Sequence, residues 1–296
     1  MRGSENNMMK RILPVGKGWF SDAISYQYSM LRHFNIEQIA ESGQAFRFYN
    51  LAERKGFYHY YNVSMDKYVE ILQQGTVVEF LTKPEWVEFW EDYFALHEED
   101  VYVKLETEIK NSSDKPLQEG RCYAEGIRVL HQNPFETTVS FMLSSANSIH
   151  NIKLYLSRFC KCYGHFEVYK IGGYEVSYWT FPTLEDLRGK VTEQDLRSLG
   201  FGFRAKNIYK FLMTGSDLNL SDANDLLSIT GIGDKIKDCI LLYGNKDYDR
   251  IPMDVWMKKA KDKLYGKDFP WDSFKPYRGI CQIYLYYYCR NNSHIF

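Results

Sequence analysis

The sequence predicts an α+β protein in which an N-terminal antiparallel β-sheet domain precedes a larger all-α domain. Short aromatic and β-branched runs, separated by turn residues, fill the first third of the 296 residues. From Pro84 the apolar residues recur with the period of a helix, and short helices that stop near glycines follow to the end of the chain. We place the β-rich domain, with a flanking helix, at residues 1–120 and the all-α domain at residues 121–296.

Four runs in the first domain have the composition and spacing of strands: residues 43–51, 56–63, 67–73 and 76–81. Turn residues between them favour an antiparallel meander. A helix follows at Pro84, because five aromatic residues recur at helical spacing: Trp86, Phe89, Trp90, Tyr93 and Phe94.

Short helices account for the remainder of the chain in this prediction, and no further strand is expected. They cover residues 134–145, 149–160, 192–200, 204–213, 221–228, 254–264 and 278–290, and one more begins at Asp234. Pro134 suits a first helical position. Thr192, Ser221 and Asp234 suit N-caps, and Thr192 has Asp195 as its capping-box partner.

Charge is distributed unevenly, although the net charge is only −1. Residues 76–136 hold 14 acidic and 6 basic side chains, whereas residues 201–296 hold 15 basic and 11 acidic side chains. A basic coat that binds polyanions over the whole surface is therefore disfavoured, but the C-terminal third could form a local nucleic-acid face. Two solvated surfaces of opposite sign are an equal alternative.

The six cysteines form neither a disulfide framework nor a zinc pattern, which is typical of reduced thiols in a cytosol. No apolar run is long enough to cross a membrane, and the N-terminus lacks the pattern of a signal peptide. We therefore expect a cytoplasmic protein that has no membrane partner and acts as a monomer.

The segment TGIGDKIKDCI, residues 230–240, predicts a tight turn between two helices. Gly231 and Gly233 permit backbone conformations that other residues avoid. With Ile232 and the start of the next helix, they would point several amides one way and form an anion site suited to a nucleic-acid phosphate. The spacing of a Walker phosphate loop is absent, so the favoured use is gripping a backbone without reading sequence.

Lys235 stands at the start of the helix that follows this turn. The positive end of the helix dipole and partial burial both favour a neutral amine, which is a nucleophile toward carbon. Asp254 follows Pro252 at the head of another helix, and its carboxylate could stabilise oxocarbenium character while a glycosidic bond breaks. Two simpler alternatives stay open: Lys235 only neutralises a phosphate, and Asp254 only caps its helix.

At these residues the sequence resembles the helix-hairpin-helix glycosylase superfamily, through the segments LLSITGIGDKIKDCILL and RIPMDVW. The lysine two residues after the second glycine, followed by Asp-Cys, resembles the 8-oxoguanine-DNA glycosylases. Five further segments match that family in order: SGQAFRF, QNPFETTVSFMLSSANSI, FPTLEDL, LGFGFRAKNI and GICQIYLYY. The resemblance spans residues 15–295 and implies that the all-α domain is a helix-hairpin-helix glycosylase domain.

The resemblance implies a bifunctional enzyme, an 8-oxoguanine-DNA glycosylase and AP lyase that acts on double-stranded DNA. Lys235 resembles the family's nucleophile, which attacks C1′, displaces the base and forms a Schiff base before β-elimination nicks the strand. Asp254 resembles the catalytic carboxylate. Gly43 resembles the glycine whose carbonyl accepts N7–H of 8-oxoguanine, a proton that guanine lacks.

The resemblance also implies how the flipped base is held. Gln282 would bind its pairing edge, and Cys239 and Tyr286 would hold its ring between them. Cys239 lies one helical turn from Lys235, and Tyr286 lies one turn from Gln282. Without the resemblance, Cys239 would be interpreted as a small core residue and Tyr286 as a core ring.

Contacts to DNA are implied for six residues: Gly231, Ile232, Gly233, Asn147, Phe203 and Arg204. The family further implies a monovalent or divalent cation at the hairpin, bound by the backbone carbonyls of Leu227, Ile229 and Ile232. No cofactor is implied for catalysis. The sequence lacks the four-cysteine cluster that would hold an iron–sulfur centre.

Four positions depart from the family pattern. Trp256 stands where eukaryotic members carry histidine, and Phe203 replaces the tyrosine that wedges into the duplex. Ala146 and Asn151 replace the asparagine and arginine that clasp the orphaned cytosine. We expect a bacterial-type, nucleoid-associated member for which cytosine selectivity is not implied.

Two other functions stay open. A non-catalytic helix-hairpin-helix DNA-binding protein would need the glycines but neither Lys235 nor Asp254. A monofunctional alkylbase glycosylase would need Asp254 but not Lys235. The presence of both residues favours the bifunctional enzyme.

Overall fold

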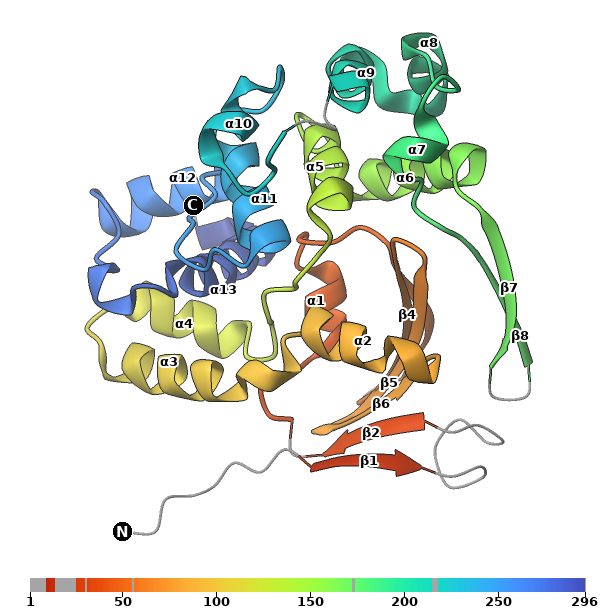
Figure 1. Cartoon of the computed structure of the whole chain (residues 1–296). Coiled ribbons are helices and arrows are strands. Elements are labelled where there is room, and N and C mark those ends of the chain that lie inside the picture. Colours follow the sequence, from red (N-terminus) through yellow and green to blue (C-terminus); the bar gives the residue numbers. More distant parts are fainter. Residues whose placement is uncertain are drawn as a thin grey trace.

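A computed structural model describes residues 9–13, 25–29, 31–54, 56–171, 174–214 and 218–295 of the chain. An antiparallel sheet forms the N-terminal part, and a group of mostly short helices forms the rest (Figure 1). The predicted α+β class, with the sheet before the helices, is confirmed.

The sheet is antiparallel throughout, and its strands pair in the order β1-β2-β6-β5-β4-β3. Its strands are β1 (Met9–Leu13), β2 (Ser25–Ser29), β3 (Phe48–Arg54), β4 (Phe57–Ser64), β5 (Lys67–Gln74) and β6 (Val77–Leu81). The last four form the predicted meander. β1 and β2 were not predicted, and they extend the sheet beyond β6.

The first predicted strand is too long at its start, since residues 43–47 form a loop and the strand begins at Phe48. Gly43 has a φ of +80°, which a strand does not allow. The amide of the buried Gln44 then bonds to the segment around Arg128 and Leu130, and this anchors the loop away from the sheet ladder.

Helices cover one face of the sheet. α1 (Ile36–Glu41) and α2 (Val87–Tyr93) contribute Ile36, Ile39 and Trp90 to one apolar cluster with the sheet residues Phe48 and Ile71. α3 (Glu99–Asn111) and α4 (Lys115–Tyr123) continue the chain to the left of them in Figure 1.

The remaining helices enclose the largest core of the molecule. They are α5 (Pro134–Leu143), α6 (Ile149–Tyr163), α7 (Leu184–Leu187), α8 (Glu193–Leu196), α9 (Ala205–Thr214), α10 (Ala223–Ser228), α11 (Asp234–Asn245), α12 (Val255–Ala260) and α13 (Arg278–Asn291). Short 3₁₀ turns occupy Pro84–Trp86, Leu96–Glu98, Gly202–Arg204, Asp272–Phe274 and Ser293–Ile295, and π turns occupy Arg197–Phe201 and Lys261–Tyr265.

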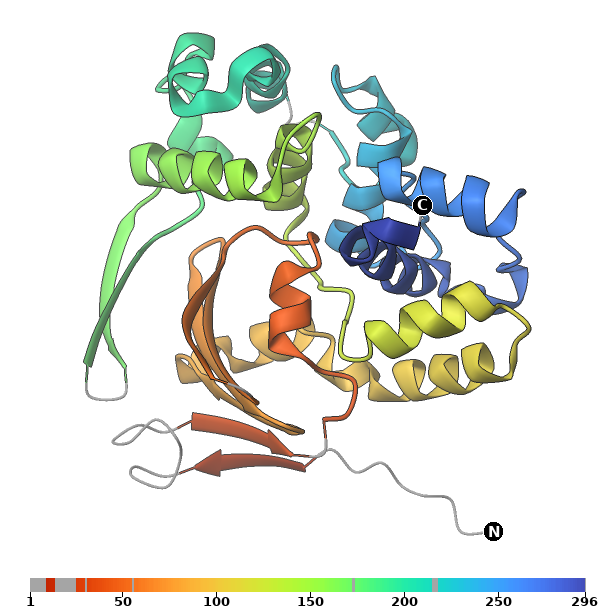
Figure 2. The ribbon, with the colours of Figure 1, turned by 180° about the vertical axis from the view of Figure 1, so that it is seen from behind.

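Helix α13 packs against α4 and α12, and Figure 2 shows these helices from behind. A Cβ atom on Gly120 of α4 would lie 3.2 Å from the Cα atom of Leu285, so the two helices approach closely. The residues of α3 and α4 therefore share the core of the helices that follow residue 121. The domain boundary at residue 120 stays a prediction.

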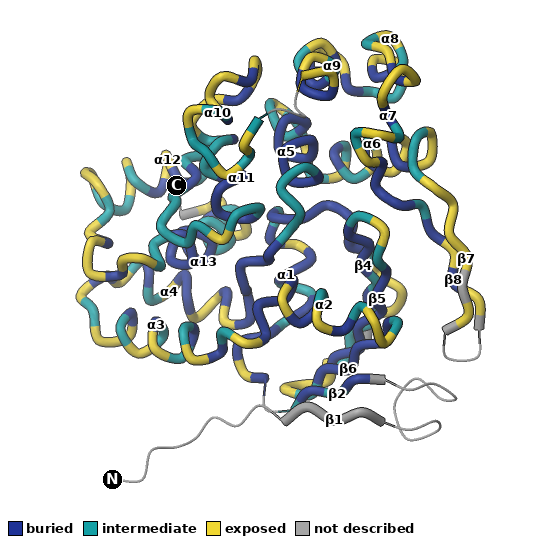
Figure 3. Tube along the Cα trace, in the orientation of Figure 1, coloured by how far each residue is buried: buried dark blue, intermediate teal, exposed yellow. Residues whose placement is uncertain are grey.

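The expectation of no strand after Pro84 is wrong. β7 (Phe166–Ile171) pairs with β8 (Tyr174–Trp179) as an antiparallel hairpin. FEVYKI and YEVSYW are rich in aromatic and β-branched residues, and Gly-Gly stands between them in the sequence, which is a hairpin pattern. Much of the hairpin is exposed, whereas buried residues follow α5 and the central strands (Figure 3).

Two of the predicted caps are wrong. Asp222, not Ser221, caps α10, since its side chain accepts from two backbone amides. Gly233 is the N-cap of α11, and Asp234 forms an ion pair with Lys237 instead, at 2.8 Å. The Thr192–Asp195 capping box and the Pro134 start are confirmed.

Within the described ranges, no helix has both the length and the apolar composition that a membrane span requires.

Candidate active site

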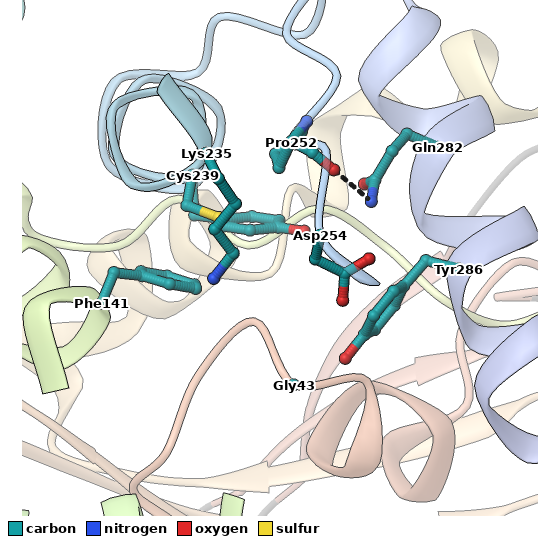
Figure 4. A pocket seen from close by; sticks show the side chains of 9 residues that line it. Gly43, Phe141, Lys235, Cys239, Pro252, Asp254, Gln282 and Tyr286 are labelled. Atoms are coloured by element: carbon teal, nitrogen blue, oxygen red, sulfur yellow. Dashed lines mark hydrogen bonds between the residues drawn. The ribbon is translucent and has the colours of Figure 1, made fainter. Parts of the chain in front are cut away.

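A small pocket lies where α5, α11, the segment before α12, α13 and the loop before β3 meet. Its lining gathers residues far apart in the sequence: Gly43, Phe141, Lys235, Cys239, Tyr243, Pro252, Asp254, Gln282 and Tyr286. Six of them are predicted catalytic or base-binding residues, and the structure brings all six together (Figure 4). The pocket adjoins a wider groove that shares several of its residues and runs past the α5–α6 turn, residues 144–148.

The hairpin between α10 and α11 places Lys235 at this pocket. The amide of Ile232 donates to the carbonyl of Ile229 at 3.0 Å, which closes the turn. Gly231 has a φ of +96°, and a Cβ atom there would lie 2.7 Å from Nδ2 of Asn207, so only glycine fits. Gly233 is extended and leads into the first turn of α11, which carries Lys235.

The amine of Lys235 points into the pocket (Figure 4). Its Nζ atom donates to Oγ of Ser144 at 3.1 Å and lies 5.2 Å from the ring centroid of Phe141. Sequence reasoning missed both partners as site residues, although they belong to the segment QNPFETTVSFMLSSANSI that matched the family. Ser144 and Phe141 hold the amine at the mouth of the pocket instead of in solvent.

Asp254 is both a helix cap and a pocket residue. Its side chain accepts from the amide of Met257 at 2.9 Å and so caps α12. Burial raises the pKa of this carboxyl group, although the Met257 amide and the charge of Lys235 act in the opposite direction. The half-buried carboxylate of Asp254 thus lies at the start of α12, in the same pocket as the amine of Lys235. This arrangement suits the stabilisation of positive charge on a sugar.

Two side chains form opposite sides of the pocket (Figure 4). Cys239 lies one turn from Lys235 on α11 and is 3% exposed. Burial raises the pKa of its thiol to about 11, so it presents a neutral sulfur. Tyr286 projects from α13, and burial raises the pKa of its hydroxyl group as well. A neutral, flat-walled slot between sulfur and ring is suited to an aromatic base.

Gln282 contributes an unpaired acceptor. Its Nε2 atom donates to the carbonyl of Pro252 at 3.4 Å, whereas its buried Oε1 atom has no hydrogen-bond partner among the described residues. Leaving a buried polar atom unpaired costs about 1–3 kcal/mol. A ligand that donates a hydrogen bond to Oε1 would remove that cost.

Gly43 closes the pocket from the side of the sheet domain. A Cβ atom at this position would lie 3.1 Å from Nη1 of Arg290, 3.2 Å from Cδ1 of Ile149 and 3.3 Å from Oη of Tyr286. The positive φ favours glycine, and a Cβ atom would also crowd these three side-chain ends. The backbone of the loop therefore approaches any ligand directly.

The predicted duplex-contacting residues outside the hairpin lie around the α5–α6 turn. Phe203 is 65% exposed and stacks on Arg204, whose guanidinium lies 4.3 Å from the ring centroid. Arg204 is buried, and it donates to the carbonyls of Ser145 at 2.6 Å and Ala146 at 2.7 Å. Asn147 donates to the carbonyl of Leu143 at 3.0 Å. In this structure Arg204 and Asn147 shape the α5–α6 turn, and Phe203 is exposed on the 3₁₀ turn at Gly202–Arg204.

A cation site at the hairpin would depend on backbone oxygens. Over the part of the chain that the structure describes, no group of three or more His, Cys, Asp and Glu side chains could hold a metal ion. The carbonyls of Leu227, Ile229 and Ile232 belong to the last turn of α10 and the turn after it, where the helix ladder ends. The Ile229 carbonyl already accepts one amide, and a carbonyl has a second lone pair.

Comparisons with known proteins agree on one group. Residues 28–138 match the family model described as 8-oxoguanine DNA glycosylase, N-terminal domain. The chain is 32% identical over 190 residues to the N-glycosylase/DNA lyase of Saccharomyces cerevisiae, a match that covers 55% of this chain and 50% of the yeast protein. It is 28% identical over 201 residues to the probable N-glycosylase/DNA lyase of Methanothermobacter thermautotrophicus, covering 58% of this chain and 61% of that protein. The matches thus span 50% and 61% of the lengths of these two relatives.

Solved structures match over nearly the full length of both chains. One of them is the Clostridium acetobutylicum 8-oxoguanine glycosylase/lyase in complex with double-stranded DNA containing cytosine opposite to 8-oxoG. The TM-score is 0.79 at 28% identity, and the match covers 96% of this chain and 98% of the clostridial chain.

Proposed function

We propose that this chain, whose residues 28–138 match the N-terminal domain of the 8-oxoguanine DNA glycosylases, is itself a DNA glycosylase and AP lyase that removes 8-oxoguanine from double-stranded DNA. One observation carries the proposal: the amine of Lys235 and the carboxylate of Asp254 line the same pocket as a slot between Cys239 and Tyr286. The likeness to the N-glycosylase/DNA lyases and to the clostridial 8-oxoguanine glycosylase/lyase supports it.

Recognition begins when the damaged nucleotide leaves the helix stack and its base enters the pocket. The ring lies between the sulfur of Cys239 and the ring of Tyr286, and its pairing edge donates to the unpaired Oε1 of Gln282. N7–H of 8-oxoguanine donates to the backbone carbonyl of Gly43. Guanine has no proton on N7, so that carbonyl loses its partner, which disfavours the normal base by about 1–3 kcal/mol.

Excision and strand cleavage both pass through the amine of Lys235. Its lone pair forms a bond to C1′ of the sugar, the bond from C1′ to the base breaks, and the base leaves with that electron pair and takes up a proton. The carboxylate of Asp254 stabilises positive charge on the sugar during this step. Ring opening gives a Schiff base, and loss of a proton from C2′ then expels the 3′ phosphate.

The contacts of the amine explain how it is aimed. Ser144 accepts a hydrogen bond from Lys235, and the ring of Phe141 lies below it, so the long side chain is already ordered before DNA arrives. Ordering a reacting group in advance lowers the entropy cost of reaching the transition state. The glycines of the hairpin would meanwhile hold the phosphate backbone.

Several finer points belong to the same proposal. The enzyme would be a bacterial-type member, as Trp256 in place of the eukaryotic histidine supports. It would act as a monomer at the bacterial nucleoid in the cytoplasm. It would need no cofactor, and a monovalent or divalent cation would bind the carbonyls of Leu227, Ile229 and Ile232 next to a DNA phosphate.

The test is covalent trapping of the Schiff base with borohydride on a duplex that contains 8-oxoguanine. The chain should form an adduct, and Lys235→Gln should form none while it still binds the duplex. Lys237→Gln is the matched control, because Lys237 lies in the same helical turn but pairs with Asp234 and does not line the pocket. An undiminished adduct in Lys235→Gln would overturn the assignment of the nucleophile, and the absence of both excision and adduct in the unmodified chain would overturn the function.

A further inference from the structure

Arg290 joins three elements at the edge of the pocket. It lies in the last turn of α13, one turn after Tyr286. Its guanidinium carbon lies 5.4 Å from the ring centroid of Tyr286 and 5.5 Å from that of Tyr287. One end of the guanidinium donates to the hydroxyl of Tyr286 at 3.4 Å, and the other end donates to the backbone carbonyl of Glu41.

The Glu41 carbonyl belongs to the loop that carries Gly43. α1 ends at Glu41, and Ser42 and Gly43 lead from it to the buried Gln44. Arg290 also packs directly on this loop, since a Cβ atom on Gly43 would lie 3.1 Å from Nη1 of the arginine. The arginine therefore links the C-terminal helix to a loop 249 residues away in the sequence.

The same loop is fixed from its other side by Gln44. The side chain of Gln44 donates to the carbonyl of Arg128 at 2.8 Å and accepts from the amide of Leu130 at 2.8 Å. Its own carbonyl accepts from Nε2 of Gln132 at 2.7 Å. Gly43 thus lies between two anchors, one at residues 128–132 between α4 and α5 and a second on α13.

We propose that Arg290 is a positioning residue of the base pocket: it fastens the loop at residues 41–44 to α13 and thereby sets the distance between Gly43 and Tyr286. This inference rests on the proposed function, because that distance matters only if a base lies between the two residues. Arg290 itself does not touch the reacting atoms.

The chemistry of the side chain fits this role. A guanidinium is planar and carries five N–H donors in a fixed arrangement, so it can stack on tyrosine rings and bond to two oxygens at once. A lysine could supply the charge and one of the hydrogen bonds, but it could not stack or bridge in the same way. Arg290 bonds to a backbone carbonyl of the loop. It can therefore hold the loop in place although Gly43 has no side chain to bond to it.

The experiment compares two substrates: a duplex with 8-oxoguanine, and the same duplex with a preformed abasic site. Cleavage at an abasic site needs the amine but no base in the pocket. Arg290→Met should slow single-turnover excision of 8-oxoguanine about tenfold or more, as expected for losing a charge-assisted hydrogen bond. Cleavage at the abasic site should stay within about twofold, which corresponds to under 0.5 kcal/mol. Arg290→Lys should fall between Arg290→Met and the unmodified chain for excision.

Lys153→Met is the matched control. Lys153 also contacts Glu41, but it pairs with the exposed side chain at 3.4 Å and not with the backbone carbonyl. Excision should be unchanged in this variant. If Arg290→Met excises 8-oxoguanine at the normal rate, or loses both activities equally, the positioning role is overturned. If the unmodified chain excises nothing, the proposed function fails instead, so the two failures are distinguishable.

Discussion

At the scale of single residues, Asp254 combines two demands that usually fall on different side chains. Its carboxylate completes the first turn of α12 and also lies in the pocket beside Lys235. Burial raises its pKa, which means that the ionised form is held at a cost. Such a cost is typical of a charge kept in place for a reaction, because a cap alone would be cheaper at an exposed position.

Replacement of Asp254 by asparagine separates the two roles. Asparagine is an equally good cap, so α12 should stay intact, but the negative charge is lost. We expect excision to slow by about 10²–10³-fold, the size of effect seen when one electrostatic contact to a transition state is removed. Single-turnover rates with and without the substitution measure this, and a rate near that of the unmodified chain would reduce Asp254 to a cap.

The raised pKa of Asp254 predicts two effects of pH, one on stability and one on the rate of excision. Because burial raises the pKa of Asp254, the folded state binds this proton more readily than the unfolded state does. Ionisation therefore removes stability as the pH rises through that window, and Asp254→Asn should melt at an equal or higher temperature at neutral pH. In the unmodified chain, excision should fall as the pH drops toward the raised pKa, since the carboxylate becomes protonated.

Sequence reasoning could predict only part of this residue-level arrangement. Lys235 and Cys239 share one helix face, and so do Gln282 and Tyr286, so their spacing predicts that they are neighbours. Spacing contains no information about the contact of Arg290 with Glu41, or of Lys235 with Ser144, since each pair meets only through the fold. Gly43 was assigned through the resemblance alone.

At the scale of elements, hydrogen bonds fix the shape of the α5–α6 turn at residues 144–148. Arg204 donates to the carbonyls of Ser145 and Ala146, and Asn147 bonds to Leu143. The side chain of Ser148 caps α6 by accepting from the amide of Asn151. The guanidinium of Arg204 and the side chains of Asn147 and Ser148 are therefore engaged in shaping this turn.

This turn predicts a relaxed preference for the base opposite the lesion. Ala146 carries no polar group, and the guanidinium of Arg204 is occupied, so few donors face an orphaned cytosine. Each missing contact should reduce discrimination by about 1–3 kcal/mol. We expect 8-oxoguanine to be removed opposite all four bases, with cytosine favoured weakly if at all. Single-turnover rates on four duplexes that differ only at that base decide the point, and a cytosine preference of about a hundredfold, nearly 3 kcal/mol, would contradict it.

The elements themselves were predictable where a local pattern determines them. β3 to β6 and most helices follow from alternation, helical period and caps. The loop at residues 43–47 was interpreted as strand because its composition is strand-like, whereas the positive φ of Gly43 and the buried amide of Gln44 decide its shape. The α11 N-cap shifted by one residue because the turn places Gly233 there.

At the scale of the whole molecule, a polar network joins the N-terminal helices to the segment after α11. The ring of His131 bonds to Asp92 at 3.1 Å and to the hydroxyl of Tyr248, and Tyr248 donates to Glu98. Lys246 pairs with the same Asp92 at 2.7 Å. Burial lowers the pKa of His131, although Asp92 and Glu98 oppose that effect.

This network predicts that acid weakens the fold. Because the pKa of His131 is lowered in the folded state, the unfolded chain takes up its proton first as the pH falls below about 6.5. The stability that depends on a neutral His131 is thus present above that pH and is lost below it. The free energy of unfolding falls by at most about 1.4 kcal/mol per pH unit for each proton. Urea unfolding at pH 8, 7, 6 and 5 should show this loss, and His131→Gln should reduce the slope.

Two comparisons make that measurement specific. The pKa of the buried His33 is lowered in the same direction, so the slope should shrink in His131→Gln but not vanish. His97, whose side chain is 67% exposed, is the control for replacing a histidine at the surface, and the effect of His131→Gln is compared with that of His97→Gln. An unaltered slope in His131→Gln would show that the network does not couple protonation to stability.

The unpaired carbonyl of Gln282 has a consequence for inhibitor design. An empty pocket that holds a buried acceptor selects small molecules by their pattern of donors, not by apolar bulk. A flat heterocycle with a ring N–H directed at Oε1 gains the hydrogen bond that the free protein lacks. Its N-methyl analogue leaves Oε1 buried and unpaired, so its binding free energy is weaker by about 1–3 kcal/mol. In competitive binding that difference is roughly ten- to a hundredfold in affinity. Gln282, which carries no charge, would therefore have a large effect on which small molecules bind the site tightly.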